Sequence, residues 1–231
     1  MIYINHNKKA IFIHIPKTGG SYIGPTLEKY YGFNSYLHLM YRKRKDHYII
    51  CKSKSIHSNN KIYDNSFFNR EIGIYLYFKT CDEYNKIMQM NEEKWQTYTK
   101  FCFIRNPYER ALSGWKHFKI IFNFTTNFYD YLNMKNIVSD IEYGHIFINQ
   151  KMQIINENGE CAIDIIGRFE NLENDFRIIL NYLGFNVNHP IKKINMSNKE
   201  NFNGLILERK TINKINEIYK DDFDAFHYIQ M

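Results

Sequence analysis

The chain lacks several patterns that would each point to a different class of protein. Its four cysteines, Cys51, Cys81, Cys102 and Cys161, show no CxxC spacing, which argues against a zinc site and favours reduced thiols. No apolar run approaches the roughly 20 residues that a membrane-spanning helix needs, and no signal peptide is visible. Neither common phosphate-loop pattern, GxxxxGK[ST] or GxGxxG, is present. We therefore expect a cytoplasmic protein with no membrane span and no metal site.

Size and charge set further limits. The 231 residues suit one α/β domain with a full hydrophobic core. The chain carries 31 Lys and Arg against 24 Asp and Glu, a net charge of +7, which suits an anionic ligand. The one basic run, residues 42–45 (RKRK), leaves open a nucleic-acid contact or a clamp for an acidic glycan. A solvated face is the simpler interpretation, and we expect no nucleic-acid partner.

Residues 11–21 read IFIHIPKTGGS and are the most informative stretch. The β-branched and aromatic residues at its start predict a buried strand, which Pro16 ends because proline has no N–H for the ladder. Gly19 and Gly20 permit positive φ and a close approach of the backbone to a ligand. Residues 21–31 then predict a helix whose free N–H groups point back at the turn. This geometry favours an anion cradle.

The side chains of this loop suit a phosphate. Lys17 would place an ammonium beside the bound anion, while Thr18 and Ser21 add hydroxyl donors. The alternative is an ordinary turn between strand and helix with a solvated lysine. This stretch alone does not exclude it.

A second stretch, residues 101–118 (FCFIRNPYERALSGWKHF), repeats the arrangement of strand, turn and helix. Phe101 to Ile104 predict a buried strand, Asn106 is placed to cap a helix, and Pro107 suits the first helical position. Arg105 would lie at the carboxyl end of its strand, at the sheet edge where Lys17 is also expected. Its guanidinium could hold a phosphate bidentately. A structural ion pair is the alternative for this arginine.

Three segments resemble the sulfotransferases that use 3′-phosphoadenosine-5′-phosphosulfate (PAPS). The string HIPKTGGS is similar to their 5′-phosphosulfate loop, in the form typical of the branch that acts on carbohydrates such as heparan and chondroitin at the 2-O position. The second stretch resembles their 3′-phosphate site, in which an arginine and a serine eight residues later, here Arg105 and Ser113, bind that phosphate. Residues 166–176 (IGRFENLENDF) resemble a stretch near the nucleotide and make Arg168 a candidate contact. We expect Glu170 and Asp175 to cap and pair within the next helix.

The resemblance implies a fold and an activity. The fold would be a three-layer α/β sandwich like that of P-loop NTPases, with a central parallel sheet flanked by helices, in a single domain over residues 1–231. Residues 33–78 would be a variable insertion on the acceptor side. The activity would move a sulfuryl group from PAPS to a hydroxyl, leaving 3′-phosphoadenosine-5′-phosphate (PAP), without a metal. The acceptor would be a glycan or another molecule with a hydroxyl group, and the oligomeric state stays open.

The general base is the part that the sequence does not supply. In many relatives a catalytic histidine precedes the helix before the RNP motif, but residues 78–80 here read FKT. His57 and His38 in the variable region are our candidate catalytic bases beside Lys17. The other histidines considered are His47, also in that region, His14, expected to be structural, and His117, for which either role is open. Ser197 and Lys199 are weak candidates near the 3′-phosphate.

Two alternative functions remain from the sequence. The missing histidine leaves open a non-catalytic protein that binds 3′-phosphoadenosine nucleotides. A nucleotide-dependent kinase is less consistent with the sequence, because neither a Walker lysine nor a pair of magnesium-binding carboxylates is apparent.

Overall fold

A computed structural model describes residues 2–35, 92–123, 125–134, 147–155, 159–187 and 207–231. The strands are β1 (Ile2–Asn5), β2 (Ala10–Ile13), β3 (Asn34–Ser35), β4 (Thr99–Ile104) and β5 (Ile165–Arg168). The α-helices are α1 (Gly20–Tyr31), α7 (Glu92–Thr97), α8 (Pro107–Phe122), α9 (Phe128–Asn133), α11 (Leu172–Tyr182), α13 (Arg209–Ile218) and α14 (Lys220–Phe226). Two 3-10 turns, η3 (Lys151–Gln153) and η4 (Phe169–Asn171), complete the described elements.

The sheet has the order β3-β1-β2-β4-β5. Strands β2, β4 and β5 run parallel, as the sequence predicts for the strands that precede the candidate anion loops. The predicted parallel strands are neighbours in the sheet, and β1 extends it by pairing antiparallel with both β2 and β3. The first residues, IYIN, form β1 because their buried side chains fold back on β2 through a tight turn in which Lys9 has φ 50. The fold is nevertheless α/β, with parallel strands flanked by helices.

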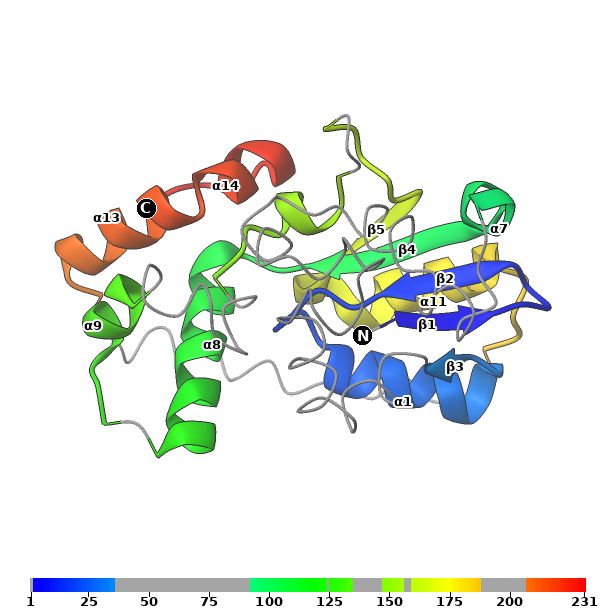
Figure 1. Ribbon diagram of the computed structural model, residues 1–231, viewed down its shortest axis with the longest axis horizontal. Coiled ribbons are helices and arrows are strands. Elements are labelled where there is room, and N and C mark those ends of the chain that lie inside the picture. The colour runs from blue at the N-terminus through cyan, green and yellow to red at the C-terminus, as the bar shows by residue number, and fades with distance from the viewer. Residues whose placement is uncertain (1, 36–91, 124, 135–146, 156–158, 188–206) are drawn as a thin grey trace, which may run out of the picture.

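Helices α1 and α11 cover one face of the sheet (Figure 1). Aromatic rings of the strands dominate that interface, with Phe12 and Phe101 stacked at 5.2 Å between ring centroids. The other face carries Ile11, Ile13 and Cys102, against which Trp95 of α7 and Phe226 of α14 pack. These two layers bury the central strands β1, β2 and β4 on both sides, whereas β3 and β5 at the edges are partly exposed.

A second cluster lies beyond the carboxyl ends of the strands. Helices α8, α9, α13 and α14 share this core, and they form the left half of Figure 1. Its largest buried residues include Tyr131 of α9 and Tyr219, which separates α13 from α14. One apolar register runs through both C-terminal helices, and it buries Ile215, Ile218, Phe223 and Phe226.

Several helix ends agree with the sequence. Asn106 caps α8, because its side chain accepts a hydrogen bond from the Tyr108 N–H at 3.0 Å, and Pro107 begins the helix. Gly184, with φ 72, follows α11, which is a common place for a glycine in the left-handed conformation. Asp175, in the first turn of α11, accepts a hydrogen bond from the Arg168 N–H at 2.7 Å, so its partner lies within residues 166–176. The same expectation for Glu170 is wrong, as the next subsection describes.

Some predictions lie outside the described residues. These are the catalytic candidates His38 and His57, His47, the basic run 42–45, most of the insertion 33–78, and the weak candidates Ser197 and Lys199.

Candidate functional site

The loop after β2 is held in a defined shape by its own backbone. The hydroxyl of the fully buried Thr18 donates to the carbonyl of Ile15 at 2.8 Å. Lys17 and Gly19 both have positive φ, at 70 and 94. Glycine adopts such angles without strain, whereas lysine does so at a cost that the surrounding contacts must offset. The loop therefore presents its backbone to the end of the sheet in one conformation.

Helix α1 begins at this loop with an unneutralised N-terminus. Its N-cap residue is Gly19, no side chain caps it, and its first turn contains no acidic residue. The N–H groups and the positive end of the helix dipole are thus suited to an external anion. A side chain on Gly20 would bring its Cβ to 2.0 Å from the ring of His14, so only glycine fits here. Ser21, in the first turn, is exposed.

The electrostatic state of Lys17 also favours binding of an anion. Its side chain is partly buried, and burial together with the nearby charge of Arg105 lowers its pKa to about 8. At neutral pH the group is still mostly an ammonium, but one whose charge lacks full hydration. A bound anion would restore that stabilisation.

Arg105 lies at the first position after β4 and reaches across to this loop. Its Nη1 donates to the carbonyl of Lys17 at 3.4 Å, while Nε and Nη2 donate to Oε2 of Glu109, both at 3.3 Å. Burial lowers the pKa of Arg105, and the carboxylates of Glu109 and Glu170 oppose that shift. Arg105 forms a structural ion pair with Glu109 and also contacts the Lys17 loop. The ion pair therefore does not rule out the predicted phosphate contact.

Phe169 joins the two anion motifs and was not identified from the sequence. Its ring lies 4.2 Å from the guanidinium carbon of Arg105, within cation–π range. The same ring would be 3.0 Å from a Cβ at Gly19. Residues 166–176 resemble a segment near the nucleotide, but within them the sequence indicates the charged Arg168 as the contact. A buried aromatic residue carries no sequence signal for this role.

Two further charged residues hold the main chain of the two loops through hydrogen bonds. Arg110, whose side chain is completely buried, donates from Nε to the carbonyl of Pro16 at 3.1 Å. Glu170 accepts from the N–H of Asn106 and, at 3.1 Å, from the hydroxyl of Tyr228. It therefore ties η4 to the start of α8 and to the C-terminal segment, and not to the next helix as expected. Both contacts join segments distant in sequence, which is why sequence reasoning missed them.

Comparison with known proteins adds a decisive finding. A family model described as the sulfotransferase family matches residues 1–229. The chain belongs to the sulfotransferase family. No curated protein and no solved structure matches it. As a sulfotransferase it transfers sulfuryl groups to acceptors that carry a hydroxyl.

The two remaining site candidates of this sulfotransferase, Ser113 and Arg168, have different surroundings. Ser113 is half-buried on α8, two turns along the helix that Arg105 precedes. Arg168 instead serves the C-terminal segment, since its Nη2 donates to the carbonyl of Phe226 at 2.7 Å and its guanidinium lies 4.7 Å from the ring of Tyr228. Its nucleotide contact stays a prediction, with the guanidinium already engaged elsewhere.

The charge of the Lys17 loop affects the pKa of one described histidine. His117, one turn beyond Ser113, is half-buried, and its pKa is lowered by burial and by the positive charge of Lys17. Its imidazole is consequently neutral at pH 7, the state in which a histidine can accept a proton. His14 packs beside Gly20 and shapes the loop, as the sequence led us to expect.

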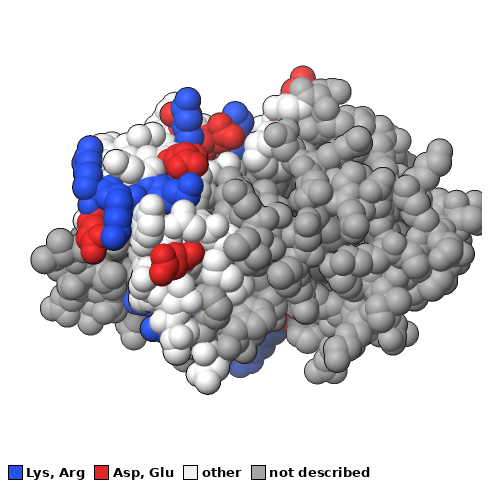
Figure 2. All heavy atoms as spheres, turned by 60° about the vertical axis from the view of Figure 1, so that its left-hand side comes forward, with Lys and Arg blue, Asp and Glu red and all other residues white. Residues whose placement is uncertain are grey.

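Charge on the outer face of the sulfotransferase is mixed. Figure 2 shows basic and acidic residues interleaved on the side of α9 and α13. There Lys210 pairs with Glu208 at 2.7 Å and Lys214 with Glu217 at 3.0 Å. Within the described ranges, no three His, Cys, Asp or Glu side chains are grouped to hold a metal ion. None of the helices described is both long and apolar enough to cross a bilayer.

Proposed function

We propose that this sulfotransferase uses PAPS as its donor and a carbohydrate hydroxyl as its acceptor. The observation that carries the proposal is the hydrogen bond from the Arg105 guanidinium to the Lys17 carbonyl, which makes one site of two anion-binding motifs 88 positions apart. A donor with phosphate groups on both its 5′ and 3′ sides is the ligand that two adjacent anion sites would suit.

The loop at Lys17 fits the 5′ side of this donor. When bound, PAPS supplies the activated sulfuryl group. The Lys17 ammonium and the uncapped N-terminus of α1 would stabilise negative charge on the leaving 5′-phosphate oxygen. Because the hydroxyl proton of Thr18 is bonded to Ile15, Thr18 would contribute its backbone N–H, and the exposed Ser21 its hydroxyl.

Arg105 and Ser113 would bind the 3′-phosphate. This contact is remote from the reacting atoms, so its binding energy orients the donor rather than taking part in the chemistry. The phosphate would meet Arg105 from the side left open by Glu109 and Lys17. Arg168 is placed farther along the same edge, on β5, and would join the contact only by leaving the Phe226 carbonyl.

The acceptor hydroxyl must lose a proton as it attacks sulfur. His57 and His38 remain the proposed bases from the variable region. His117 adds a third candidate, because it is neutral at pH 7 and lies within electrostatic reach of Lys17. Substituting each by alanine and comparing the pH profiles of transfer would separate them, since only loss of the base removes the acidic limb of the profile.

Transfer from isotopically labelled PAPS to a panel of glycans tests the function. Lys17→Ala and Arg105→Ala should each lower transfer by at least about a hundredfold. Matched controls are Lys29→Ala at the exposed end of α1 and Arg177→Ala on α11, which should leave transfer unchanged. Transfer that survives both site substitutions would contradict the assignment. Tight binding of PAP with no transfer to any acceptor would indicate the non-catalytic nucleotide-binding protein instead.

A further inference from the structure

Gln150 pairs with the main chain of Arg105 in the manner of a neighbouring strand. Its Oε1 accepts from the Arg105 N–H at 2.8 Å, and its Nε2 donates to the Arg105 carbonyl at 2.8 Å. Arg105 is the first residue after β4, so the carboxamide continues the hydrogen-bond ladder by one residue. Gln150 is completely buried, and both bonds are thus shielded from water.

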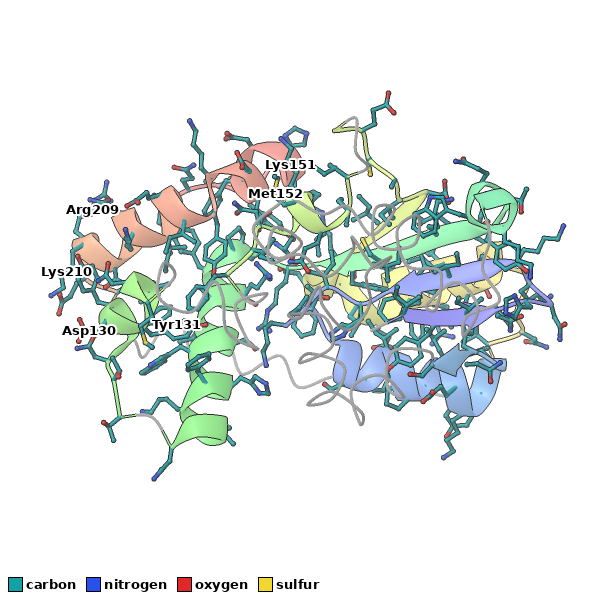
Figure 3. The ribbon with its side chains drawn as sticks, in the orientation of Figure 1. Asp130, Tyr131, Lys151, Met152, Arg209 and Lys210 are labelled. Carbon is teal, nitrogen blue, oxygen red and sulfur yellow. The ribbon has the colours of Figure 1, made fainter. Side chains whose placement is uncertain are left out.

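A buried carboxylate fixes which way this carboxamide points. Asp222 of α14 accepts from Nε2 of Gln150 at 3.2 Å through Oδ2, and from the N–H of Lys151 at 2.9 Å through Oδ1. Figure 3 labels Lys151 and shows it beside α14. A reversed carboxamide would set its oxygen against the Asp222 carboxylate and its NH₂ group against the Arg105 N–H. Both contacts would be repulsive, so the charge of Asp222 selects the orientation that holds Arg105.

The same carboxylate is linked to the other anion motif. Nη1 of Arg110 lies 3.9 Å from Oδ2 of Asp222, and Nε of Arg110 donates to the carbonyl of Pro16. Both side chains are completely buried. A buried ion pair contributes little net stability, because the desolvation of two charges offsets their attraction. The pair instead fixes the position of α14 relative to the main chain at Pro16 and, through Gln150, at Arg105.

We infer that Gln150, oriented by Asp222, is a positioning residue for recognition of the nucleotide's 3′-phosphate. The inference rests on the proposed function, because it concerns the same PAPS site. The Arg105 side chain can meet both the Lys17 carbonyl and a phosphate only if its Cα stays where β4 ends. Gln150 fixes that position through the two bonds to the Arg105 main chain. It makes no contact with the guanidinium, so its effect on phosphate binding is indirect.

The test compares binding of two nucleotides by titration calorimetry. PAP carries the 3′-phosphate and adenosine 5′-monophosphate lacks it, so the ratio of their dissociation constants reports the 3′-phosphate contact alone. Wild-type protein should prefer PAP by at least about tenfold, as a charge-assisted contact provides. Gln150→Met keeps the side-chain volume but makes neither bond to Arg105. It should reduce the preference by about tenfold while changing the affinity for the monophosphate by less than about twofold.

Two more variants complete the experiment. Gln153→Ala is the matched control, since this nearby glutamine donates to the carbonyls of Ile148 and Asn149, and the preference should stay at the wild-type value. Gln150→Leu also makes neither bond to Arg105 and puts no second carboxyl group beside Asp222, and it carries the test if the methionine variant does not fold. It should lose the preference in the same way.

The outcomes separate the two proposals. A wild-type protein with no preference for PAP would overturn the nucleotide site, and this inference with it. A wild-type preference that both Gln150 variants retain would overturn the inference alone. A purely structural role for Gln150 would weaken both nucleotides equally and leave their ratio unchanged, which would also overturn it.

Discussion

Nη1 of Arg105 donates a hydrogen bond to the backbone carbonyl of Lys17 at 3.4 Å, across 88 positions of sequence. The contact joins the ends of β2 and β4, two neighbouring parallel strands. Burial and the nearby charge of Arg105 both make the Lys17 ammonium harder to keep charged without an anion. A negative group bound beside Lys17 would offset that cost.

Nucleotide affinity should fall in alkaline solution, because the pKa of Lys17 is lowered to about 8. A bound phosphate favours the ammonium and raises this pKa, so binding above pH 8 requires uptake of a proton. The affinity for PAP should then decrease by about tenfold for each pH unit above 8. Titration calorimetry at pH 7 to 9.5 measures this. In Lys17→Arg the guanidinium stays charged and the decrease should vanish; a wild-type affinity that is constant up to pH 9.5 would contradict the assignment of Lys17.

Glu109→Gln should tighten nucleotide binding. The Glu109 carboxylate accepts from Nε and Nη2 of Arg105 and so competes with a phosphate for the same donors. Since partly exposed ion pairs contribute up to about 1 kcal/mol, the gain should be about two- to fivefold in the dissociation constant of PAP. Glu173→Gln, which removes a comparable partner from Arg177 on α11, should have no effect. Weaker binding in Glu109→Gln would instead mean that Glu109 orients the arginine for its ligand.

Phe169→Leu should weaken binding more than a comparable change elsewhere in the same core. The substitution keeps most of the apolar volume but removes the ring from the guanidinium of Arg105, 4.2 Å away. We expect the affinity for PAP to fall about three- to tenfold, as the loss of a partly desolvated cation–π contact implies. Phe176→Leu is the control, because Phe176 of α11 is buried in the same cluster. Both variants should lose similar thermal stability; equal losses of affinity would show that Phe169 acts only through packing.

Gly19→Ala should disable the loop. The residue has φ 94, where alanine is strained by about 1–2 kcal/mol, and the new Cβ would press on Phe169 at 3.0 Å. Displacement of the loop N–H groups should cost at least about tenfold in sulfuryl transfer. Gly159→Ala provides the comparison, since φ there is 80 but a Cβ would meet nothing within 4 Å. It should lose a similar amount of stability and retain transfer, and an equal fall in both variants would refute the specific role of the loop.

Much of the framework could be predicted because the decisive signals are local. The apolar run before Pro16, the glycine pair and the cap at Asn106 each depend on residues within a few positions, and each has the predicted structure. The antiparallel strand β1 was missed because four residues give too little periodicity to separate a strand from an irregular start. The break between α13 and α14 at Tyr219 has no signal in the sequence, because both helices share one apolar register.

The sequence by itself determined that two loops of this sulfotransferase are suited to anions, since each follows a predicted strand, carries a basic residue, Lys17 or Arg105, and leads into a helix. Only the tertiary structure decided that the two loops lie together, because the order of strands in the sheet places the end of β2 beside the end of β4. It also decided which residues support the charges. Phe169, Gln150 and Asp222 are ordinary residues in the sequence. In the fold Phe169 and Gln150 are buried against Arg105 and Asp222 is buried against Gln150, where low polarity strengthens each contact.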